Sequence, residues 1–204
     1  MKNQSNFLAY VFLFLTVTFW AGNFVVGKFA SIYEVPPFSL NFYRWFFAWV
    51  ILAPFTLPEI IKKKDYIINN YKLFIILGVT SITIFNSIVY YSLNFTQVIS
   101  GVLMISTIPV MIMFFSSILK IEKTNIFQII GVILSFLGVI IIITKANFEI
   151  LKNLNFNKGD VTMVVAMFSW ALYSTLLKRQ TYEISQLSLL QVVMSFGLVF
   201  LIPI

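Results

Sequence analysis

The stretch Phe19-Trp20-Ala21-Gly22-Asn23-Phe24-Val25-Val26-Gly27-Lys28 has a partial copy near the other end of the chain. Trp170-Ala171 and Lys178 repeat its Trp-Ala pair and its lysine 150 positions later (170 − 20 and 178 − 28). We place five apolar spans between the starts of the two copies, and because five is odd, equivalent helices cross a membrane in opposite directions. An inverted repeat of this kind is typical of secondary transporters. Three matched residues are few enough to arise by chance, so the interpretation needs independent support.

The composition is that of a membrane protein. Of 204 residues, 60% are apolar and 10% are charged, whereas soluble domains have about 45–50% and about 25%. The apolar residues fall into blocks at 7–30, 37–58, 72–93, 98–119, 125–144, 160–177 and 187–204. Each block approaches the ~20 residues that a helix needs to cross about 30 Å of hydrocarbon, and none alternates like a barrel strand. The pattern predicts an all-α, polytopic transmembrane helix bundle with seven helices.

The chain contains no cysteine and no histidine. This excludes a disulfide framework, a thiolate site and an imidazole metal ligand, and we expect neither a metal nor a cofactor. A net charge of +7 can indicate nucleic acid binding, but here the basic residues stand singly or in short groups between apolar spans. At such positions they contact lipid headgroups or set topology. We therefore expect a lipid bilayer and no nucleic acid as partners. The sequence leaves the oligomeric state open, and a homodimer is one of the alternatives.

The basic residues also predict an orientation. With the N-terminus in the cytoplasm, nine fall inside, namely Lys2, Lys62, Lys63, Lys64, Lys72, Lys120, Lys123, Lys178 and Arg179. Four fall outside or at outer helix ends, namely Lys28, Lys145, Lys152 and Lys158. This follows the positive-inside bias and favours a multi-pass protein of the cytoplasmic (inner) membrane. Lys28 and Lys178 lie on opposite faces, as an inverted pair requires, although snorkelling lysines commonly close spans without any repeat.

Three segments organise the chain. We divide it into a first five-helix repeat, 1–144, an outer linker, 145–159, and the start of a second, inverted repeat, 160–204. The linker is the longest connection, so no soluble domain fits between the spans. Because one repeat already occupies most of the chain, we expect the second to be incomplete. The alternative is a protein of seven helices.

Small residues and a proline mark the fourth and fifth spans. Gly131, Ser135 and Gly138 share one face of the fifth span, with the small-xxx-small spacing that lets helices approach closely, and we interpret them as packing residues. Pro109 lies inside the fourth span and frees a backbone carbonyl, so we expect a kink there. In a transporter such a kink can serve as a hinge, whereas in most membrane helices it is merely tolerated.

Several motifs, taken in their order and spacing, resemble the EamA-type drug/metabolite transporter family. They are Phe19 to Lys28, Arg44 in a Phe/Leu-rich second helix, Tyr90-Tyr91-Ser92-Leu93, Ile105 to Pro109, Glu122 followed by Gly131 to Val139, and Gly159-Asp160 through Trp170-Ala171. The resemblance covers nearly the whole chain. It implies a ten-helix fold of two inverted five-helix repeats, with seven helices present and both termini of the complete fold cytoplasmic. It also implies a small metabolite, amino acid or drug carried across the cytoplasmic membrane, usually outward.

Polar and aromatic residues inside the spans are candidates for a solute path, because buried polar groups in hydrocarbon need partners or a wet cavity. The candidates for substrate binding are Trp20, Asn23, Arg44, Asn86, Tyr90, Trp170 and Tyr173. Rings provide apolar area and amides fix orientation, so a cavity lined by them suits an amphipathic organic solute. The alternative is interfacial anchoring or hydrogen bonding between helices, which we favour for Asn86 and Tyr173. Arg44 can bind an anionic group, snorkel outward or bond backbone carbonyls.

The positions of the acidic residues limit other functions. All seven lie at span ends or in loops, so the sequence shows no membrane carboxylate that carries a proton. Intramembrane catalysis needs His, Cys, paired carboxylates or a Ser-Lys pair, and because the spans offer none we expect no enzyme. The sequence predicts an integral membrane carrier for a small organic solute, with export as the expected direction. The alternative is a non-transporting membrane fragment or a structural or assembly subunit.

Overall fold

The computed structural model describes residues 2–121, 125–144, 149 and 157–202. These residues form helices joined by short turns, with no strand among them. Within them, four stretches are long and apolar enough to cross a membrane, namely Phe7–Ile32, Pro37–Lys62, Tyr71–Ser92 and Lys158–Lys178. Shorter apolar helices cover Ile108–Ile118, Ile126–Gly138 and Gln186–Val199. The predicted all-α, polytopic bundle is confirmed.

The first two spans are long, uninterrupted helices. The helices are α1 (Lys2–Ile32), α2 (Pro37–Lys62) and the short α3 (Lys64–Asn69). After α1, Glu34 takes a left-handed conformation with φ 57°, and the Val35 N–H donates to Ala30 O at 2.9 Å, the pattern of a Schellman cap. Pro37 then starts α2, because its fixed φ suits a first turn. The segment 59–71, which the sequence predicts as a loop, is helical almost throughout.

The third span changes its helix type partway along. It consists of α4 (Tyr71–Gly78), the π-helix η1 (Val79–Asn86) and α5 (Ser87–Ser92). At the start of η1 the Thr80 hydroxyl donates to Ile76 O and the Ser81 hydroxyl donates to Leu77 O, both at 2.6 Å. Hydroxyls that bond the preceding turn bend helices, and π-turns frequently occur at functional sites. The sequence predicts one regular helix over 72–93, because apolar periodicity does not reveal a local change in winding.

The fourth span is interrupted next to its proline. The helices here are α6 (Val98–Ile105), α7 (Ile108–Ile118) and α8 (Ile126–Thr144). The interruption falls at Ser106 and Thr107, just ahead of Pro109, whose ring nitrogen cannot donate a backbone hydrogen bond. The chain therefore breaks its helix where the sequence predicts a kink. Glu122, which the sequence places before the fifth span, lies outside the described residues.

The last two helices start with side-chain caps. They are α10 (Lys158–Lys178) and α11 (Gln186–Val199). Asn157 and Asp160 form a capping box, in which the Asp160 N–H donates to Asn157 Oδ1 and the Asn157 N–H donates to Asp160 Oδ2, both at 3.0 Å. Ser185 caps α11 by accepting the Ser188 N–H. Such caps satisfy the free N–H groups of a first turn. The predicted linker, 145–159, lies largely outside the described residues.

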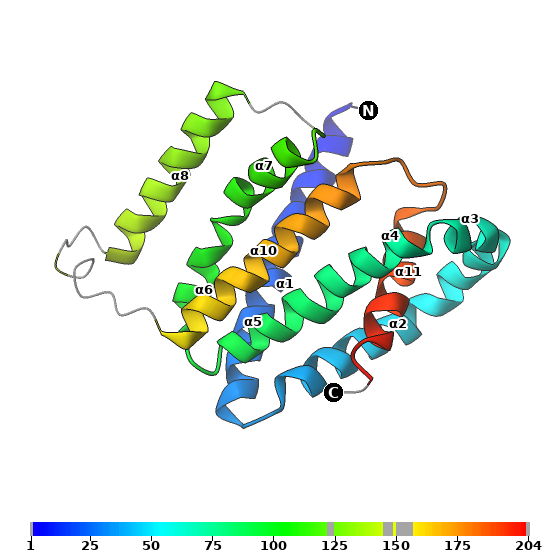
Figure 1. Cartoon of the computed structure of the whole chain (residues 1–204), viewed down its shortest axis with the longest axis horizontal. Helices are drawn as coiled ribbons and strands as arrows, with labels where there is room; N and C mark the ends of the chain where they lie inside the picture. Colours follow the sequence, from blue (N-terminus) through cyan, green and yellow to red (C-terminus); the bar gives the residue numbers. More distant parts are fainter. Residues whose placement is uncertain (1, 122–124, 145–148, 150–156, 203–204) are drawn as a thin grey trace.

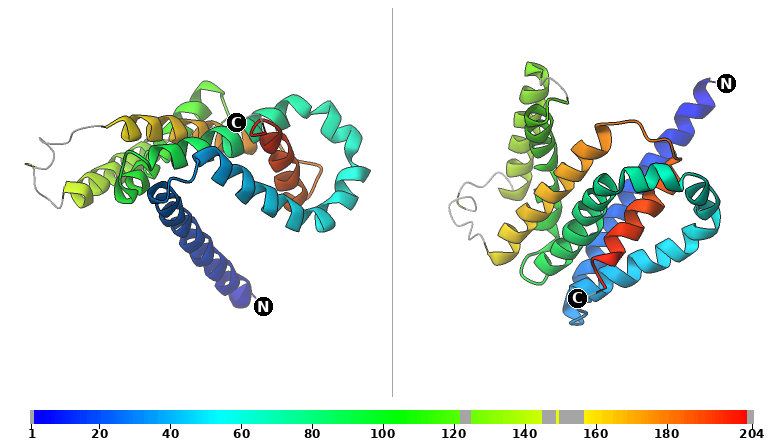
Figure 2. Two further views of the ribbon diagram at one scale, coloured as in Figure 1. Left: turned by 90° about the horizontal axis from the view of Figure 1, so that it is seen from below. Right: turned by 45° about the vertical axis from the view of Figure 1, so that its right-hand side comes forward.

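The arrangement of the helices places α10 at the centre of the bundle. In Figure 1, α10 lies between α5 on one side and α6 and α7 on the other, and α1 runs in the opposite direction to α10. This is the relation that an inverted repeat requires between the first and sixth spans. The N-terminal half of α1 projects away from the other helices, and α8 stands at the edge of the bundle (Figure 2).

Two buried clusters hold the helices together. The first surrounds α5 and α10 and contains Phe24, Leu93 and Met167, and the second joins α4 to α11. Where α4 and η1 cross α11, the backbones touch: a Cβ on Gly78 would lie 2.7 Å from Gly197 N, and one on Gly197 would lie 2.9 Å from Gly78 O. Only glycine permits this approach. The sequence analysis missed this pair, because no spacing relates two residues on distant helices.

Candidate functional site

Four polar side chains from the first three spans meet around Arg44. Arg44 Nη1 donates to Asn23 Oδ1, and Arg44 Nη2 donates to Asn86 Oδ1 at 2.6 Å. The Tyr90 hydroxyl donates to the same Asn23 oxygen at 2.6 Å. Asn23 belongs to α1, Arg44 to α2, Asn86 to η1 and Tyr90 to α5. We call these four residues the Arg44 centre, and all four are among the seven that the sequence proposes for substrate binding.

The Arg44 centre holds a cation that has no counter-ion among the described residues. Tyr90 is 2% exposed and Asn86 is 5% exposed, while Asn23 and Arg44 are half-buried. In the described part of the chain, no carboxylate lies within ion-pair distance of the guanidinium. The rings of Trp45 and Tyr90 lie 4.8 and 5.4 Å from Arg44 Cζ and favour the cation through their π-faces. Placing an arginine at the bilayer centre costs about 2.5–3.5 kcal/mol on insertion scales, and neutral oxygens and rings offset that cost here.

The π-helix fixes the position of Asn86. The Asn86 side-chain amide donates to Ser81 O, within η1, at 2.7 Å, which leaves its Oδ1 facing Arg44. One turn before Arg44, the fully buried Asn41 donates to Ile82 O at 2.8 Å. Asn41 thereby ties α2 to η1 and keeps the guanidinium in register with Asn86. The sequence analysis favoured a bridging role for Asn86 and did not single out Asn41.

The other three proposed residues lie in a group of rings beside the Arg44 centre. Trp170 on α10 is in the middle: its ring centroid lies 4.5 Å from Phe85, 5.1 Å from Tyr173 and 6.0 Å from Trp20. Phe85 directly precedes Asn86 in the chain. Trp20 lies one helical turn before Asn23, the other amide of the Arg44 centre. We call these four residues the aromatic cluster. The two repeat-related tryptophans, far apart in sequence, thus lie within one cluster.

Three of the four proposed packing and hinge residues border a groove between α7 and α8. The groove has a volume of about 460 Å³, and Pro109, Gly131 and Ser135 contribute to its lining. A Cβ at Gly131 or Gly138 would meet no other atom within 4 Å in the described part of the chain. The packing role of this face and the hinge role of Pro109 therefore stay predictions.

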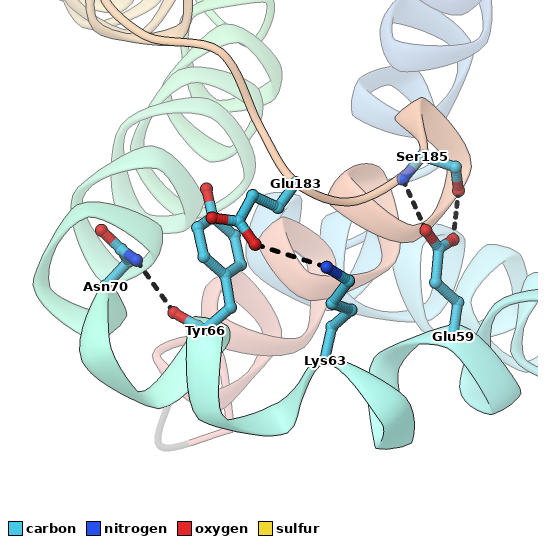
Figure 3. A network of polar contacts seen from close by, with 6 residues as sticks. All are labelled: Glu59, Lys63, Tyr66, Asn70, Glu183 and Ser185. Carbon is cyan, nitrogen blue, oxygen red and sulfur yellow. Dashed lines mark hydrogen bonds and ion pairs between the residues drawn. The ribbon is translucent and has the colours of Figure 1, made fainter.

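A second polar cluster joins α2 to the start of α11 at one end of the bundle (Figure 3). The Glu59 carboxylate accepts the Ser185 N–H at 2.9 Å and the hydroxyls of Ser185 and Ser188, both at 2.5 Å. Nearby, Lys63 Nζ lies 3.3 Å from Glu183 Oε2. We call this group the Glu59 cap. The sequence analysis missed it, and the only signal was a pair of serines at the start of an apolar run, which is typical of a helix N-terminus.

At the other end of the bundle, Asp160 fixes the start of α10 to the end of the third span. The Thr96 hydroxyl donates to Asp160 Oδ1 at 2.6 Å. On the same segment, Lys28 Nζ donates to Leu93 O at 2.7 Å and to Thr96 O at 3.0 Å. These bonds hold the C-terminal end of α1 in place. Lys28 therefore closes its span by bonding carbonyl groups of a neighbouring helix end.

The Arg44 centre has the chemistry of a binding site. A guanidinium offers five N–H donors in a planar fork, and the tyrosine hydroxyl beside it donates in the same direction. Among the described residues, no three His, Cys, Asp or Glu side chains stand close enough to hold a metal ion. The arrangement can therefore hold an acceptor group of a ligand, next to rings that can cover its apolar part.

Comparison with known proteins connects this chain to transporters. The EamA-like transporter family matches it over residues 7–144. "Uncharacterized transporter YyaM" of Bacillus subtilis (strain 168) is 27% identical over 195 residues, covering 96% of this chain and 64% of that protein. An "Uncharacterized transporter" of Archaeoglobus fulgidus is 27% identical over 201 residues, covering 97% of this chain and 67% of that protein. The chain thus spans about two thirds of the length of these relatives, and no solved structure matches it.

Proposed function

We propose that this chain, which belongs to the EamA-like transporter family, carries a small organic solute outward across the cytoplasmic membrane. The observation that supports this most is the Arg44 centre, in which polar groups from three spans converge within a hydrophobic bundle. Ionisable and polar residues inside a membrane are costly, and they mark solute or ion pathways where they occur.

The solute path runs between the Arg44 centre and the aromatic cluster. The guanidinium orients a polar group of the solute, and Trp20, Trp170 and Tyr173 cover its apolar surface. Trp20 is 36% exposed, so the side of α1 is where we expect the solute to enter. In this proposal all seven residues named from the sequence act on one solute.

The orientation of the path is also a proposal, with the N-terminus in the cytoplasm. The N-terminus, α3 and the C-terminal ends of α7 and α10 lie toward the same side of the molecule in Figure 1. The lysine run Lys62-Lys63-Lys64 is on that side, between α2 and α3. This agrees with the positive-inside bias. A reporter fused after residue 68 is expected to score as cytoplasmic, and a periplasmic score would overturn the orientation.

A flux measurement tests the carrier function. The purified chain is reconstituted into proteoliposomes loaded with a mixture of small metabolites, and the efflux of each is followed over time. We expect efflux of one chemical class above that of protein-free vesicles. Arg44→Ala is expected to abolish this efflux, because it removes the cation of the centre. Arg179→Ala is the matched control, since it removes an exposed arginine at the end of α10.

The results separate two candidate functions. Efflux that survives in Arg44→Ala at normal expression would reject the role of Arg44 but keep the carrier. Absence of efflux for every metabolite, with folded protein in the vesicles, would reject the carrier. That result would favour the alternative of a structural or assembly subunit.

A further inference from the structure

We propose, building on the carrier function, that the solute bears a carboxylate, and that this carboxylate replaces Asn23 as the acceptor of Arg44. The proposal goes beyond a solute path because it assigns a charge to the solute and an exchange to one side chain. Its starting point is the guanidinium that has no counter-ion among the described residues.

The positive charge of Arg44 favours an anionic partner. Its present acceptors are the neutral amide oxygens of Asn23 and Asn86. A carboxylate makes shorter, charge-assisted and bidentate bonds to a guanidinium, roughly twice as strong as bonds to neutral groups. In surroundings of low dielectric constant, the gain from pairing the charge is larger than in water. The amides therefore hold the guanidinium in the absence of a solute and are weaker partners than an organic anion.

Of the two amides, Asn23 is the one that can leave. Asn86 is 5% exposed, and its own N–H group is bonded to Ser81 O at 2.7 Å, so its orientation is fixed. Asn23 is half-buried and stands on α1, the helix whose N-terminal half projects from the bundle (Figure 2). Its Oδ1 accepts from both Arg44 and Tyr90. If Asn23 moves away, Arg44 Nη1 and the Tyr90 hydroxyl lose their shared acceptor. These two donors point at one place, and they match the two oxygens of a carboxylate.

The aromatic cluster describes the rest of the solute. Trp20 lies one turn from Asn23, and Phe85 is next to Asn86 in the chain. A carboxylate at Arg44 therefore places the attached carbon skeleton against rings. Trp170 packs with both rings, at 6.0 Å from Trp20 and 4.5 Å from Phe85. Aromatic side chains prefer flat apolar partners at such distances. The geometry points to organic acids with an aromatic or branched apolar body.

The exchange also releases part of α1. With Asn23 displaced, the polar bonds that remain to hold α1 in the described structure include those of Lys28 to Leu93 O and Thr96 O. These lie at the C-terminal end of the helix. Solute binding would then allow the N-terminal part of α1 to swing about this end. In this way the presence of the anion and the position of one helix become coupled.

A binding experiment tests the exchange. The 204-residue chain in lipid nanodiscs is titrated at pH 7 with phenylacetate and with its neutral amide, phenylacetamide. Binding is followed by tryptophan fluorescence, because Trp20, Trp45 and Trp170 lie in or beside the site. We expect phenylacetate to bind at least about tenfold more tightly than the amide, and Arg44→Gln to remove the difference. Equal affinities, or no binding of phenylacetate, would overturn the anionic assignment.

Asn23→Ala gives the most specific result. If Asn23 competes with the solute, its removal tightens phenylacetate binding about threefold to tenfold, the size of one net hydrogen bond. If Asn23 instead binds the solute directly, the same change weakens binding, and the exchange is refuted. Asn94→Ala is the control, since Asn94 is exposed and bonds only within its own turn. Monodisperse elution of each variant shows that it is folded.

The movement of α1 has its own measurement. The chain has no cysteine, so spin labels can be attached to Phe14→Cys on α1 and Val161→Cys on α10, whose native side chains are 73% and 60% exposed. Phenylacetate is expected to broaden or shift the distance distribution, while phenylacetamide leaves it unchanged. An unchanged distance with bound phenylacetate would refute the coupling. Flux of neutral solutes only would refute the anionic class and leave the carrier function intact.

Discussion

α1 and α10 share the Trp-Ala pair and the lysine of the repeat, yet one is peripheral and the other is central. Met163 and Met167 of α10 are 0% exposed, whereas their counterparts Leu13 and Val17 of α1, 150 positions earlier, are 60% and 63% exposed. The difference arises because α10 packs against the third and fourth spans, while α1 contacts them only near its C-terminal end. The shared Trp-Ala pair and lysine thus do not decide how deeply a helix is buried, because its neighbours determine that.

The contrast has a functional meaning. The aromatic cluster and the Arg44 centre lie where the loosely held helix meets the firmly held part of the bundle. Trp20 and Asn23 come from α1, and Trp170 comes from α10. A site shared between a peripheral and a central helix would change its shape if the peripheral helix moved by a small amount. We therefore expect substitutions on or next to α10 to have larger effects than substitutions on or next to α1.

The largest difference is expected from shortening matched core side chains. Met163→Ala leaves a cavity in the first buried cluster, and we expect a loss of about 2–3 kcal/mol of unfolding free energy, the lower half of the range for soluble cores. We expect the lower half of that range because lipid tails are as apolar as the protein core, so a side chain gains little by moving from lipid into the core. Leu13→Ala should change stability by less than about 0.5 kcal/mol, as for exposed sites. Unfolding of both variants in detergent mixtures measures the difference, and equal losses would show that α1 is as firmly packed as α10.

One glycine from each helix gives the next effect. A Cβ on Gly159 would lie 2.7 Å from Ser92 O and 2.9 Å from Thr96 N, whereas one on Gly22 would meet no atom within 4 Å. Gly159→Ala should therefore cost about 1–2 kcal/mol through overpacking. Gly22→Ala should be neutral or stabilise by up to about 1 kcal/mol, because alanine favours helix more than glycine. Thermal unfolding monitored by circular dichroism compares the two, and a stabilising Gly159→Ala would contradict the close approach of α10.

A smaller effect is expected at the start of α10. Asn157→Ala removes the side-chain acceptor of the capping box and should cost about 1 kcal/mol, a typical value for a lost N-cap. Asn157→Ser keeps an acceptor and should restore most of the stability. Hydrogen exchange of the first turn of α10 is expected to speed up in the alanine variant only. Equal exchange in both variants would mean that the bonds of Asp160 are enough to hold the turn.

The smallest effect at neutral pH concerns the tyrosines that follow the two helices. Burial raises the pKa of Tyr182, after α10, to about 12, and its hydroxyl is buried with no hydrogen-bond partner among the residues that the structure describes. Above pH ~10 an unfolded tyrosine loses its proton while the folded Tyr182 keeps it, so stability falls as the pH rises from about 10 to 12. Tyr182→Phe should remove this part of the alkaline loss and leave stability at pH 7 unchanged or slightly higher. Tyr33→Phe, at a position 77% exposed after α1, should change neither, and an unaltered alkaline profile for Tyr182→Phe would refute the assignment.

The sequence predicts the membrane spans and most of the candidate site, for a simple physical reason. The length of an apolar run of residues indicates a membrane span directly, and a polar residue inside a span needs a partner. Asn23, Arg44, Asn86 and Tyr90 were each identified in this way, and the structure shows that they are partners of one another. The sequence does not predict which helices lie close together. The spacing of residues along the chain defines one face of one helix and says nothing about its neighbours.

Two features show this limit clearly. Gly131 and Gly138 have the spacing of a packing face, yet a Cβ at either would meet open space in the described structure. Gly78 and Gly197 have no recognisable spacing, and yet they bring α4 and α11 into backbone contact. The π-helix η1 was missed for a related reason. A change in winding follows from local hydroxyl bonds and from neighbouring helices, neither of which alters the apolar pattern.

The Glu59 cap has a consequence for biogenesis. Glu59 of α2 accepts the Ser185 N–H and the hydroxyls of Ser185 and Ser188 at the start of α11, and Ser185 follows Glu59 by 126 residues. During synthesis, the Glu59 carboxylate at the end of α2 therefore lacks these partners until the seventh span arrives. The bonds between Glu59 and the start of α11 then form last. The earlier half of the chain thus acts as a template on which the later half is assembled, and Glu59→Gln should slow this last step more than it weakens the finished bundle.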